Sequence, residues 1–344
     1  MKFIKRMIAG GLALALGITA IGCSKEQGGE AGDKPSLGGK KKISFVLDWT
    51  PNTNHTGIYV ALSKGYFAEE GLDVEIVQPP EDGAISAVAS GQAQFGVSFQ
   101  ENLGEAIAAD YPAPITAVAT IIEHNTSGIL SLQEADIQNF AQLSGKRYAT
   151  WGLAVEQEIL KYAVESMGGD FSKVEMVPHS GADALSLLRS GTVDAVWVYE
   201  TWDNVVADLT DDILTNYVPF VSADPVLDYY TPIIISNNDF LKNDPETAKA
   251  FMRATSKGYN FAIEHPSEAA DILLEAVPEL DKDLVKESQE ILALYYKAEK
   301  NEWGFIDEAR WAPFFDFMYA HRLIDKELGS AGFSNDYLPD PAEK

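Results

Sequence analysis

The sequence predicts an α/β protein with two similar lobes and a ligand cleft between them. One observation is a strand–helix–strand pattern in residues 43–77. Another is a helix, a Ser-Gly turn and an apolar strand that occur twice, in GAISAVASGQAQFGVSFQE from Gly83 and in GADALSLLRSGTVDAVWVYE from Gly181. The period of this repeat is too long for a solenoid, so it indicates two α/β units of similar construction.

The pattern in residues 43–77 is the most regular part of the chain. Ile43–Leu47 is an apolar run rich in β-branched and aromatic residues, which is typical of a strand covered on both faces. A polar loop, a helix ending near Gly65, and the strand Asp73–Val77 follow. Because open α/β sheets bind ligands beyond the carboxyl ends of their strands, the end of the first strand is a candidate site. It contains Asp48, Trp49, Asn54 and His55.

The same reasoning predicts the remaining elements. We expect strands at 94–98, 113–122, 146–150, 173–177, 193–198 and 230–236, and helices at 81–90, 154–167, 181–190, 246–264, 267–276, 281–296 and 306–321. The C-terminal helices outnumber what one sheet requires, so the chain returns to its first lobe. We therefore expect lobe I to comprise residues 43–124 plus 230–344 and lobe II to comprise 125–229. Hinges are expected near 122–127 and 222–231.

The N-terminus has the pattern of an export signal. Basic residues precede an apolar stretch, 7–22, which is too short to span a membrane comfortably. Small or apolar residues then precede Cys23, the only cysteine, as at a bacterial lipoprotein processing site. We expect a signal peptide at 1–22, lipidation of Cys23, a flexible tether at 23–42, and a location on the extracellular face of the cytoplasmic membrane. Plain secretion is the alternative.

Charge and missing motifs exclude several classes of function. The formal net charge of −26 repels phosphates, so we exclude nucleic acid as a partner. The sequence contains no GxxxxGK[ST], no HExxH and no GxSxG, and no GxGxxG follows a predicted strand. Its five histidines lack metal-ligand spacing. We expect a binding protein rather than an enzyme, with no catalytic residues, no cofactor and no metal.

Aromatic and hydrogen-bonding side chains gather at the predicted strand ends. Glu200 closes an apolar strand, where a carboxylate can accept from an exocyclic amine or a ring N–H. Aromatic faces stack on flat rings. Together these features favour a flat heterocyclic ligand, although each aromatic can instead belong to the core and His55 can instead cap a helix. The candidates are Asp48, Trp49, Asn54, His55, Gln100, Asn102, Trp151, Tyr199, Glu200 and Tyr230.

Four segments resemble the thiamine-pyrimidine branch of the substrate-binding proteins of ABC importers. They are DWTPNTNHTGIYVALSKGYFAEEGLDVEIV, SGQAQFGVS, DAVWVYE and NNDFLKNDPE. The resemblance implies a type II periplasmic-binding fold, a monomer, permease partners in the membrane, and the ligand N-formyl-4-amino-5-aminomethyl-2-methylpyrimidine from thiamine salvage. Because sulfonate, nitrate and taurine binders share SKGYFAEEGLDVEI, such a solute is the alternative ligand. A pyrimidine-related enzyme is a further alternative.

The fungal hydroxymethylpyrimidine phosphate synthases are similar in fold but differ at their functional positions. The resemblance places that family's pyridoxal-linked lysine at Ser98 and its histidine at Asn102. Its cysteine-rich iron-binding run falls on Val226–Tyr230, which has no cysteine, and its phosphate loop falls near Gly152–Val155, which keeps one glycine. Each departure removes catalysis or phosphate binding. Ser98 and Gly152 therefore count among the expected binding residues, in a cradle for a neutral or weakly basic pyrimidine.

Overall fold

The computed structural model describes residues 39–179, 183–210, 212–297 and 302–340, which lie in one compact unit. The expected signal peptide, Cys23 and most of the expected tether lie outside the described residues. Among the helices that are described, none is long and apolar enough to cross a membrane.

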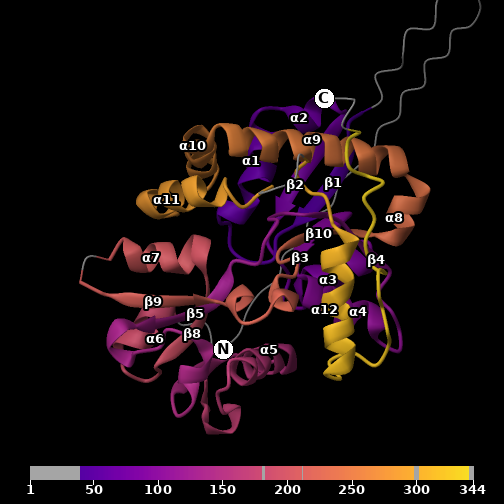
Figure 1. The fold of residues 1–344 in the computed structure, drawn as a ribbon. Coiled ribbons are helices and arrows are strands. Elements are labelled where there is room, and N and C mark those ends of the chain that lie inside the picture. Colours follow the sequence, from indigo (N-terminus) through magenta and orange to yellow (C-terminus); the bar gives the residue numbers. More distant parts are fainter. Residues whose placement is uncertain (1–38, 180–182, 211, 298–301, 341–344) are drawn as a thin grey trace, which may run out of the picture. The chain divides into compact units, whose positions relative to one another are not determined.

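The first sheet has the strand order β2-β1-β3-β10-β4 (Figure 1). β1 pairs in parallel with β2 and β3, whereas β10 pairs antiparallel with β3 and β4. The expected strand–helix–strand unit and the return of the chain to this sheet are both present. The strands are β1 (Lys41–Val46), β2 (Leu72–Val77), β3 (Phe95–Ser98), β4 (Ile115–Thr120) and β10 (Ile233–Asn237).

The second sheet repeats this plan with the order β7-β6-β8-β5-β9. β6 pairs in parallel with β7 and β8, and β5 pairs antiparallel with β8 and β9. The third strand of each sheet follows a short helix and a Ser-Gly turn, so the repeat seen in the sequence is a repeat of topology. The strands are β5 (Ser127–Leu132), β6 (Arg147–Thr150), β7 (Glu175–Pro178), β8 (Ala195–Tyr199) and β9 (Thr215–Pro219).

Helices cover both sheets. The α-helices are α1 (Thr56–Ser63), α2 (Tyr66–Glu69), α3 (Gly83–Ala89), α4 (Gln100–Ala108), α5 (Ala154–Ser166), α6 (Ala184–Arg189), α7 (Val205–Asp208), α8 (Asn238–Asn243), α9 (Pro245–Glu264), α10 (Pro266–Ala276), α11 (Lys282–Leu292) and α12 (Glu308–Ala320). A π-helical turn, η5, covers Glu200–Asn204, and short 3₁₀ turns cover Thr53–His55, Gln133–Ala135, Phe140–Leu143, Phe171–Lys173, Phe220–Ser222 and Pro225–Leu227.

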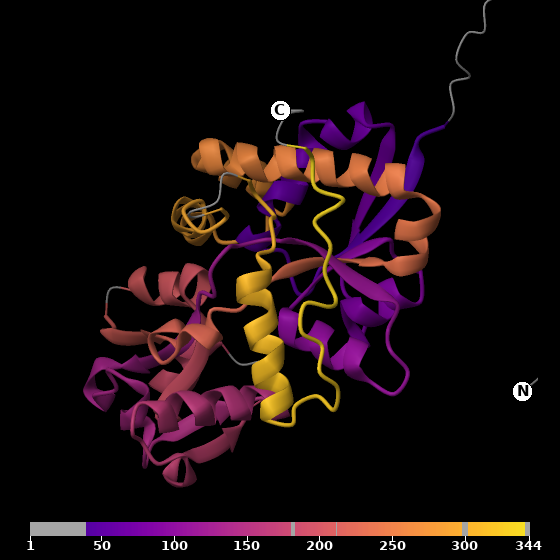
Figure 2. The same cartoon turned by 45° about the vertical axis from the view of Figure 1, so that its right-hand side comes forward.

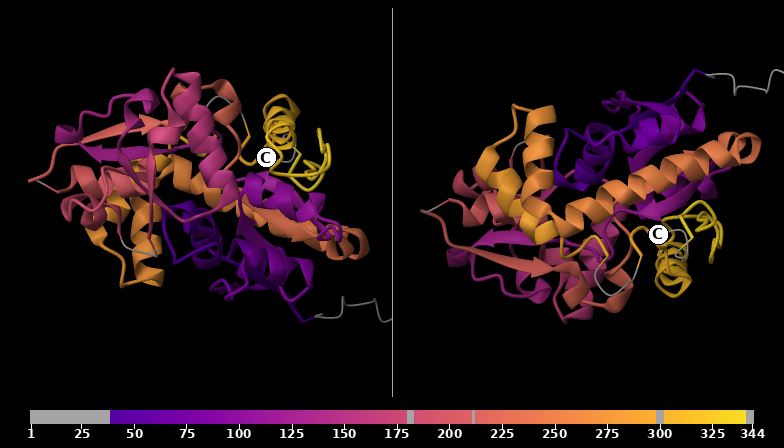
Figure 3. Two further views of the ribbon diagram at one scale, coloured as in Figure 1. Left: turned by 90° about the horizontal axis from the view of Figure 1, so that it is seen from below. Right: turned by 90° about the horizontal axis from the view of Figure 1, so that it is seen from above.

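Two C-terminal helices position the site. The long helix α9 runs across the first sheet and packs on α1 (Figure 3). α12 stands beside elements of both sheets (Figure 2). On α12, Phe317 meets the ring of Tyr162 from α5 edge-on at 5.0 Å between centroids, and His321 Nδ1 lies 2.8 Å from Glu158 Oε1.

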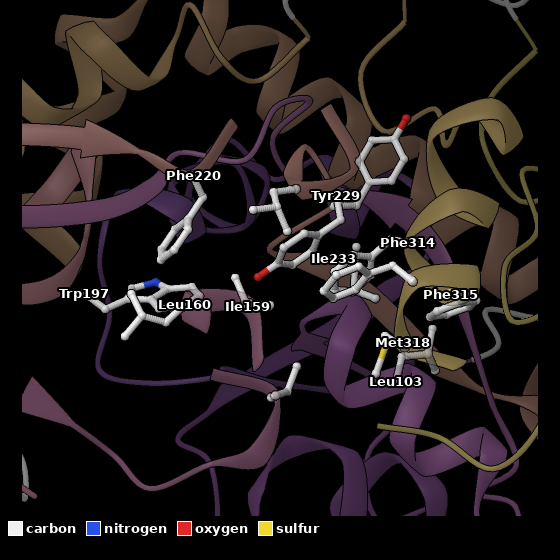
Figure 4. Close-up of a cluster of buried hydrophobic side chains, with 14 of the residues drawn as sticks. Leu103, Ile159, Leu160, Trp197, Phe220, Tyr229, Ile233, Phe314, Phe315 and Met318 are labelled. Carbon is white, nitrogen blue, oxygen red and sulfur yellow. The ribbon is translucent and has the colours of Figure 1, made fainter. Parts of the chain in front are cut away.

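A buried apolar cluster runs from the second sheet to α12 (Figure 4). Trp197 of β8 packs on Phe220 with 4.1 Å between ring centroids. Tyr229, in the segment that returns to the first sheet, stacks on Phe314 of α12 at 3.8 Å. In Figure 4 Tyr229 lies between Phe220 and Phe314, so the connecting segment is part of the core.

Candidate functional site

The loop after β1 contains a hydrogen-bond network around the fully buried His55. The backbone N–H of Asn52 donates to His55 Nδ1 over 3.1 Å. His55 Nε2 therefore carries the ring proton and donates to Asp48 Oδ1 over 2.6 Å. The ring makes no capping bond to α1, so it positions Asp48 rather than the helix.

A pocket of about 490 Å³ opens beside Asp48, between the start of α3 and the first turns of α4. Ser98 and Asn102, two other predicted residues, line it together with Asp48. Its volume suits one substituted heteroaromatic ring. A second groove of about 520 Å³ lies between α9 and the C-terminal segment, and no predicted site residue lines it. We therefore take the pocket beside Asp48 as the candidate site.

Tyr199 approaches Asp48 from the second sheet. Burial raises the pKa of Tyr199, and the negative charges of Glu101 and Asp48 raise it further. The phenol thus lies within the electrostatic field of both carboxyl groups. A residue at the end of β8 is thus close enough to a residue after β1 to feel its charge, in keeping with the rule for strand ends.

Glu101, in the first turn of α4, is the acidic residue that sequence reasoning missed. Its Oε2 is buried and has no hydrogen-bond partner among the described residues. Burial raises its pKa to about 8, and the charge of Glu105 in the next helical turn contributes. Its pattern in the sequence, an acid three residues after the end of a buried strand, is a signal that could have suggested it.

Glu200 lies in a different setting from Tyr199, although the two residues are adjacent. Its Oε2 accepts from the hydroxyl of Tyr295 over 3.0 Å, and its backbone N–H donates to the carbonyl of Thr126 over 2.8 Å. Its charge also raises the pKa of Tyr217, after burial. β8 ends at Tyr199 and η5 begins at Glu200, so the change of backbone conformation separates the two side chains. Tyr199 lies in the field of Asp48, whereas Glu200 contacts Tyr295. Nothing in the local sequence would have suggested Tyr295.

Two predicted residues already have partners inside the protein. Gln100 is fully buried, its Nε2 donates to the carbonyl of Trp311 over 2.8 Å, and its Oε1 accepts from the backbone N–H of Tyr230 over 2.9 Å. Tyr230 is also fully buried, and its hydroxyl accepts from the backbone N–H of Asp307 over 2.9 Å. These contacts join the first sheet to α12. Gln100 and Tyr230 therefore stabilise the packing of the elements around the site.

The exposed tryptophans follow β1 and β6. Trp49 is 58% exposed and adjoins Asp48. Trp151 is 44% exposed, and its ring lies 5.9 Å from that of Trp197. Next to it, Gly152 adopts a φ of 80°, which favours glycine, and its N–H donates to Thr150 Oγ1 over 2.9 Å. Both tryptophans offer apolar faces to solvent.

The predicted residues thus form one central group and several outlying ones. Asp48, Ser98 and Asn102 line one pocket, and the charges of Asp48 and Glu101 both act on Tyr199. Asn54 is half-buried, and its carbonyl accepts from the hydroxyl of Tyr259 over 2.7 Å. Throughout the described part of the chain, no group of three His, Cys, Asp or Glu side chains is arranged to hold a metal ion.

Comparisons with known proteins agree with this architecture. Residues 52–269 match the family described as NMT1/THI5 like. The formylaminopyrimidine-binding protein of Halalkalibacterium halodurans is 31% identical, over 83% of this chain and 87% of that protein. The 4-amino-5-hydroxymethyl-2-methylpyrimidine phosphate synthase THI13 of Saccharomyces cerevisiae is 25% identical, over 88% of this chain and 90% of that protein.

Among solved structures, the alkanesulfonate-binding protein SsuA from Xanthomonas axonopodis pv. citri superposes with a TM-score of 0.65. The match covers 85% of this chain and 98% of that chain at 15% identity, and it shows the fold, which is the expected two-lobed periplasmic-binding-protein type. From the family match and the 31% identical relative, the chain belongs to the NMT1/THI5-like family.

Proposed function

We propose that this chain is the extracytoplasmic solute-binding component of an ABC importer for thiamine salvage. Its ligand is N-formyl-4-amino-5-aminomethyl-2-methylpyrimidine. The observation that carries the proposal is the pocket-lining Asp48 carboxylate, which His55 fixes over 2.6 Å and which is followed in the sequence by the exposed Trp49. A fixed acceptor beside a flat apolar face suits an aminopyrimidine, whose amine donates while its ring stacks. The name of the relative from Halalkalibacterium halodurans supports this ligand.

The charge of the pocket disfavours the alternative of a sulfonate or nitrate ligand. The described lining contains three acidic residues, Asp48, Asp82 and Glu105, and no lysine or arginine. An anion in this pocket would face like charges without a cationic partner, which costs several kcal/mol in an interface. A neutral or weakly basic heterocycle has no such cost.

The side chains of the pocket favour a protein that binds the pyrimidine unchanged over a synthase that produces it. Ser98 and Asn102 line it, and neither side chain offers the amine or imidazole that resemblance to the synthases leads one to expect at these positions. Serine and asparagine donate and accept hydrogen bonds, so they can orient a ring without reacting with it.

The proposed mechanism is closure of the two lobes around the ligand. Lobe I comprises residues 43–124 plus 230–344, and lobe II comprises 125–229. Bound ligand favours the closed arrangement. Only that arrangement allows it to contact Asp48 and Trp49 of lobe I and Tyr199 of lobe II at the same time. The closed monomer then presents its surface to the membrane permease, while lipidated Cys23 retains it on the extracellular face.

Titration calorimetry of residues 24–344 tests the ligand directly. The panel comprises the formylaminopyrimidine, the corresponding aminopyrimidine, thiamine, taurine and nitrate. We expect tight binding of a pyrimidine and none of taurine or nitrate. Overnight incubation followed by mass analysis is expected to return the ligand unchanged. Binding of taurine alone, or conversion of the pyrimidine, would contradict the proposal.

A further inference from the structure

The carboxyl group of Glu101, which precedes the pocket-lining Asn102 in the first turn of α4, has an unused hydrogen-bonding oxygen. Its Oε2 is buried without a partner among the described residues, although buried polar groups in proteins are nearly always hydrogen-bonded. The neighbouring Ser98 and Asn102 both line the pocket. Leaving a buried carboxyl oxygen unsatisfied costs stability, and a ligand that supplies the missing partner recovers that cost on binding.

We propose that Glu101 is a specificity-determining residue whose carboxyl group pairs with the edge of the pyrimidine that carries a ring nitrogen next to an exocyclic amine. One hydrogen bond joins the carboxyl O–H to the ring nitrogen, and a second joins the amine N–H to the other carboxyl oxygen. The inference rests on the proposed function and deepens it, because it names the group that reads this edge of the ring.

The neighbours of Glu101 account for this chemistry. Glu105, one turn further along α4, is acidic. Tyr199 and Tyr229 are phenols whose pKa values are raised by burial and by the charge of Glu101. No cation is among the groups that set these pKa values, so Glu101 retains its proton at neutral pH, with a pKa of about 8. A protonated carboxyl both donates and accepts, whereas a carboxylate only accepts.

In this pairing, two acidic residues form different hydrogen bonds with the ligand. Asp48, which accepts from His55 Nε2, is held as an acceptor only. Glu101 adds a donor and an acceptor side by side, and this pattern matches the ring-nitrogen and amine edge of a 4-aminopyrimidine. A ligand without that edge leaves the Glu101 oxygen unsatisfied, so the residue selects for aminopyrimidines among flat rings.

The test measures the affinity for the formylaminopyrimidine between pH 7 and pH 10 in four proteins. They are the wild type, Glu101→Gln, Glu101→Met and, as a matched control, Asp110→Asn, at an exposed carboxylate just after the same helix. Glutamine keeps one donor and one acceptor but does not titrate, and methionine fills the space without either. Thermal unfolding followed by circular dichroism checks that each variant folds.

Wild-type affinity is expected to stay level up to about pH 8 and then to fall by about tenfold per pH unit, because the donor is lost with the proton. Glu101→Gln is expected to bind about as well as the wild type at pH 7 and to lose the pH dependence. Glu101→Met is expected to bind about 10- to 100-fold more weakly. Asp110→Asn is expected to keep the wild-type profile.

Two outcomes would overturn the inference. One is wild-type affinity in Glu101→Met, and the other is the full decline with pH in Glu101→Gln, which remains decisive even if the methionine variant fails to fold. Either result would leave the proposed function intact, since the wild type still binds. A well-folded wild-type protein that binds no pyrimidine would instead contradict the proposed function and this inference together.

Discussion

At the scale of the residue, one carboxylate oxygen of Glu200 accepts a hydrogen bond within the protein, and the other remains available to a ligand. Its Oε2 accepts from the hydroxyl of Tyr295 over 3.0 Å. Burial, together with the charge of Glu200, raises the pKa of Tyr295 to about 12, so this phenol stays protonated and keeps donating across the physiological range. The contact fixes the direction of the carboxylate at the end of β8. Under the proposed function, we therefore expect Glu200 to receive a ligand N–H without rearranging.

Replacement of Glu200 by glutamine is expected to weaken pyrimidine binding by about 1.5–3 kcal/mol, the range for hydrogen bonds to charged groups. Calorimetric titration at neutral pH measures the change. Glu175→Gln is the matched control, because Glu175 is an exposed carboxylate at the opposite end of a strand in the same sheet. Equal affinities of Glu200→Gln and the wild type would remove Glu200 from the binding site.

At the scale of the element, the contact between α1 and α9 depends on two glycines. A Cβ on Gly258 of α9 would lie 2.0 Å from the backbone carbonyl oxygen of Gly57 on α1, and a Cβ on Gly57 would lie 2.3 Å from the ring of Tyr259. Backbone cannot move aside as a flexible side chain can. The close approach matters for the site, because α1 follows directly on the loop that holds Asp48 and His55.

Gly258→Ala is expected to lower the free energy of unfolding by about 1–3 kcal/mol, as overpacking does in a well-packed core. The sign is informative, because alanine inside an unobstructed helix would stabilise by up to about 1 kcal/mol over glycine. Urea unfolding measures the change. The exposed neighbour Lys257, replaced by alanine, provides a control expected to stay within about 0.5 kcal/mol of the wild type. A stabilised Gly258→Ala protein would contradict the account.

Helices and strands with a regular pattern of apolar residues, or with a residue such as proline marking their start, could be predicted from the sequence. The other elements could not. The prolines at the starts of α9 and α10 and the apolar runs of β1, β3 and β8 give local signals. β5 and β9 were not predicted. β5 is almost entirely buried but includes Gly128 and Ser131, so it has no alternation, and β9 is mostly half-buried. β5 and β9 pair with each other although they are far apart in the sequence. This long-range pairing stabilises both strands, and a local sequence pattern cannot predict it.

The same limit applies to the site. Asp48 and Tyr199 could be predicted because each ends a strand, and strand ends meet. The role of His55 as the holder of Asp48 and the position of Tyr295 beside Glu200 depend on tertiary packing, which a local pattern does not encode. Glu101 was missed although its neighbours Gln100 and Asn102 were predicted, because its buried, unpartnered oxygen is a result of tertiary packing.

At the scale of the whole molecule, a charged cluster joins the two segments that connect the sheets. His124 Nδ1 lies 2.7 Å from Asp228 Oδ2, and the backbone N–H of Asn125 donates to Asp228 Oδ1 over 2.9 Å. Arg310 of α12 lies 3.6 Å from the same carboxylate. Although burial alone would raise the pKa of Asp228, these hydrogen bonds and the charge of Arg310 lower it on balance.

Asp228→Asn is therefore expected to destabilise the protein by about 1–3 kcal/mol at pH 7. A lowered folded-state pKa means that the stabilisation is present above the ordinary aspartate pKa, near 3.9, and is lost as the pH falls below it. Urea unfolding at pH 7 and pH 3 is expected to show a difference that shrinks at the lower pH. Asp239→Asn, at an exposed aspartate, serves as the control. A difference that grows in acid would contradict this assignment.

The crystal structure of the complex with the formylaminopyrimidine tests the central claim most directly. The account predicts that the ring lies against Trp49 and Tyr199. It also predicts that the ring-nitrogen and amine edge lies within hydrogen-bond distance of carboxyl groups from Asp48, Glu101 and Glu200. A pyrimidine bound elsewhere, such as the groove between α9 and the C-terminal segment, or a ring whose polar edge meets none of these carboxyl groups, would contradict it.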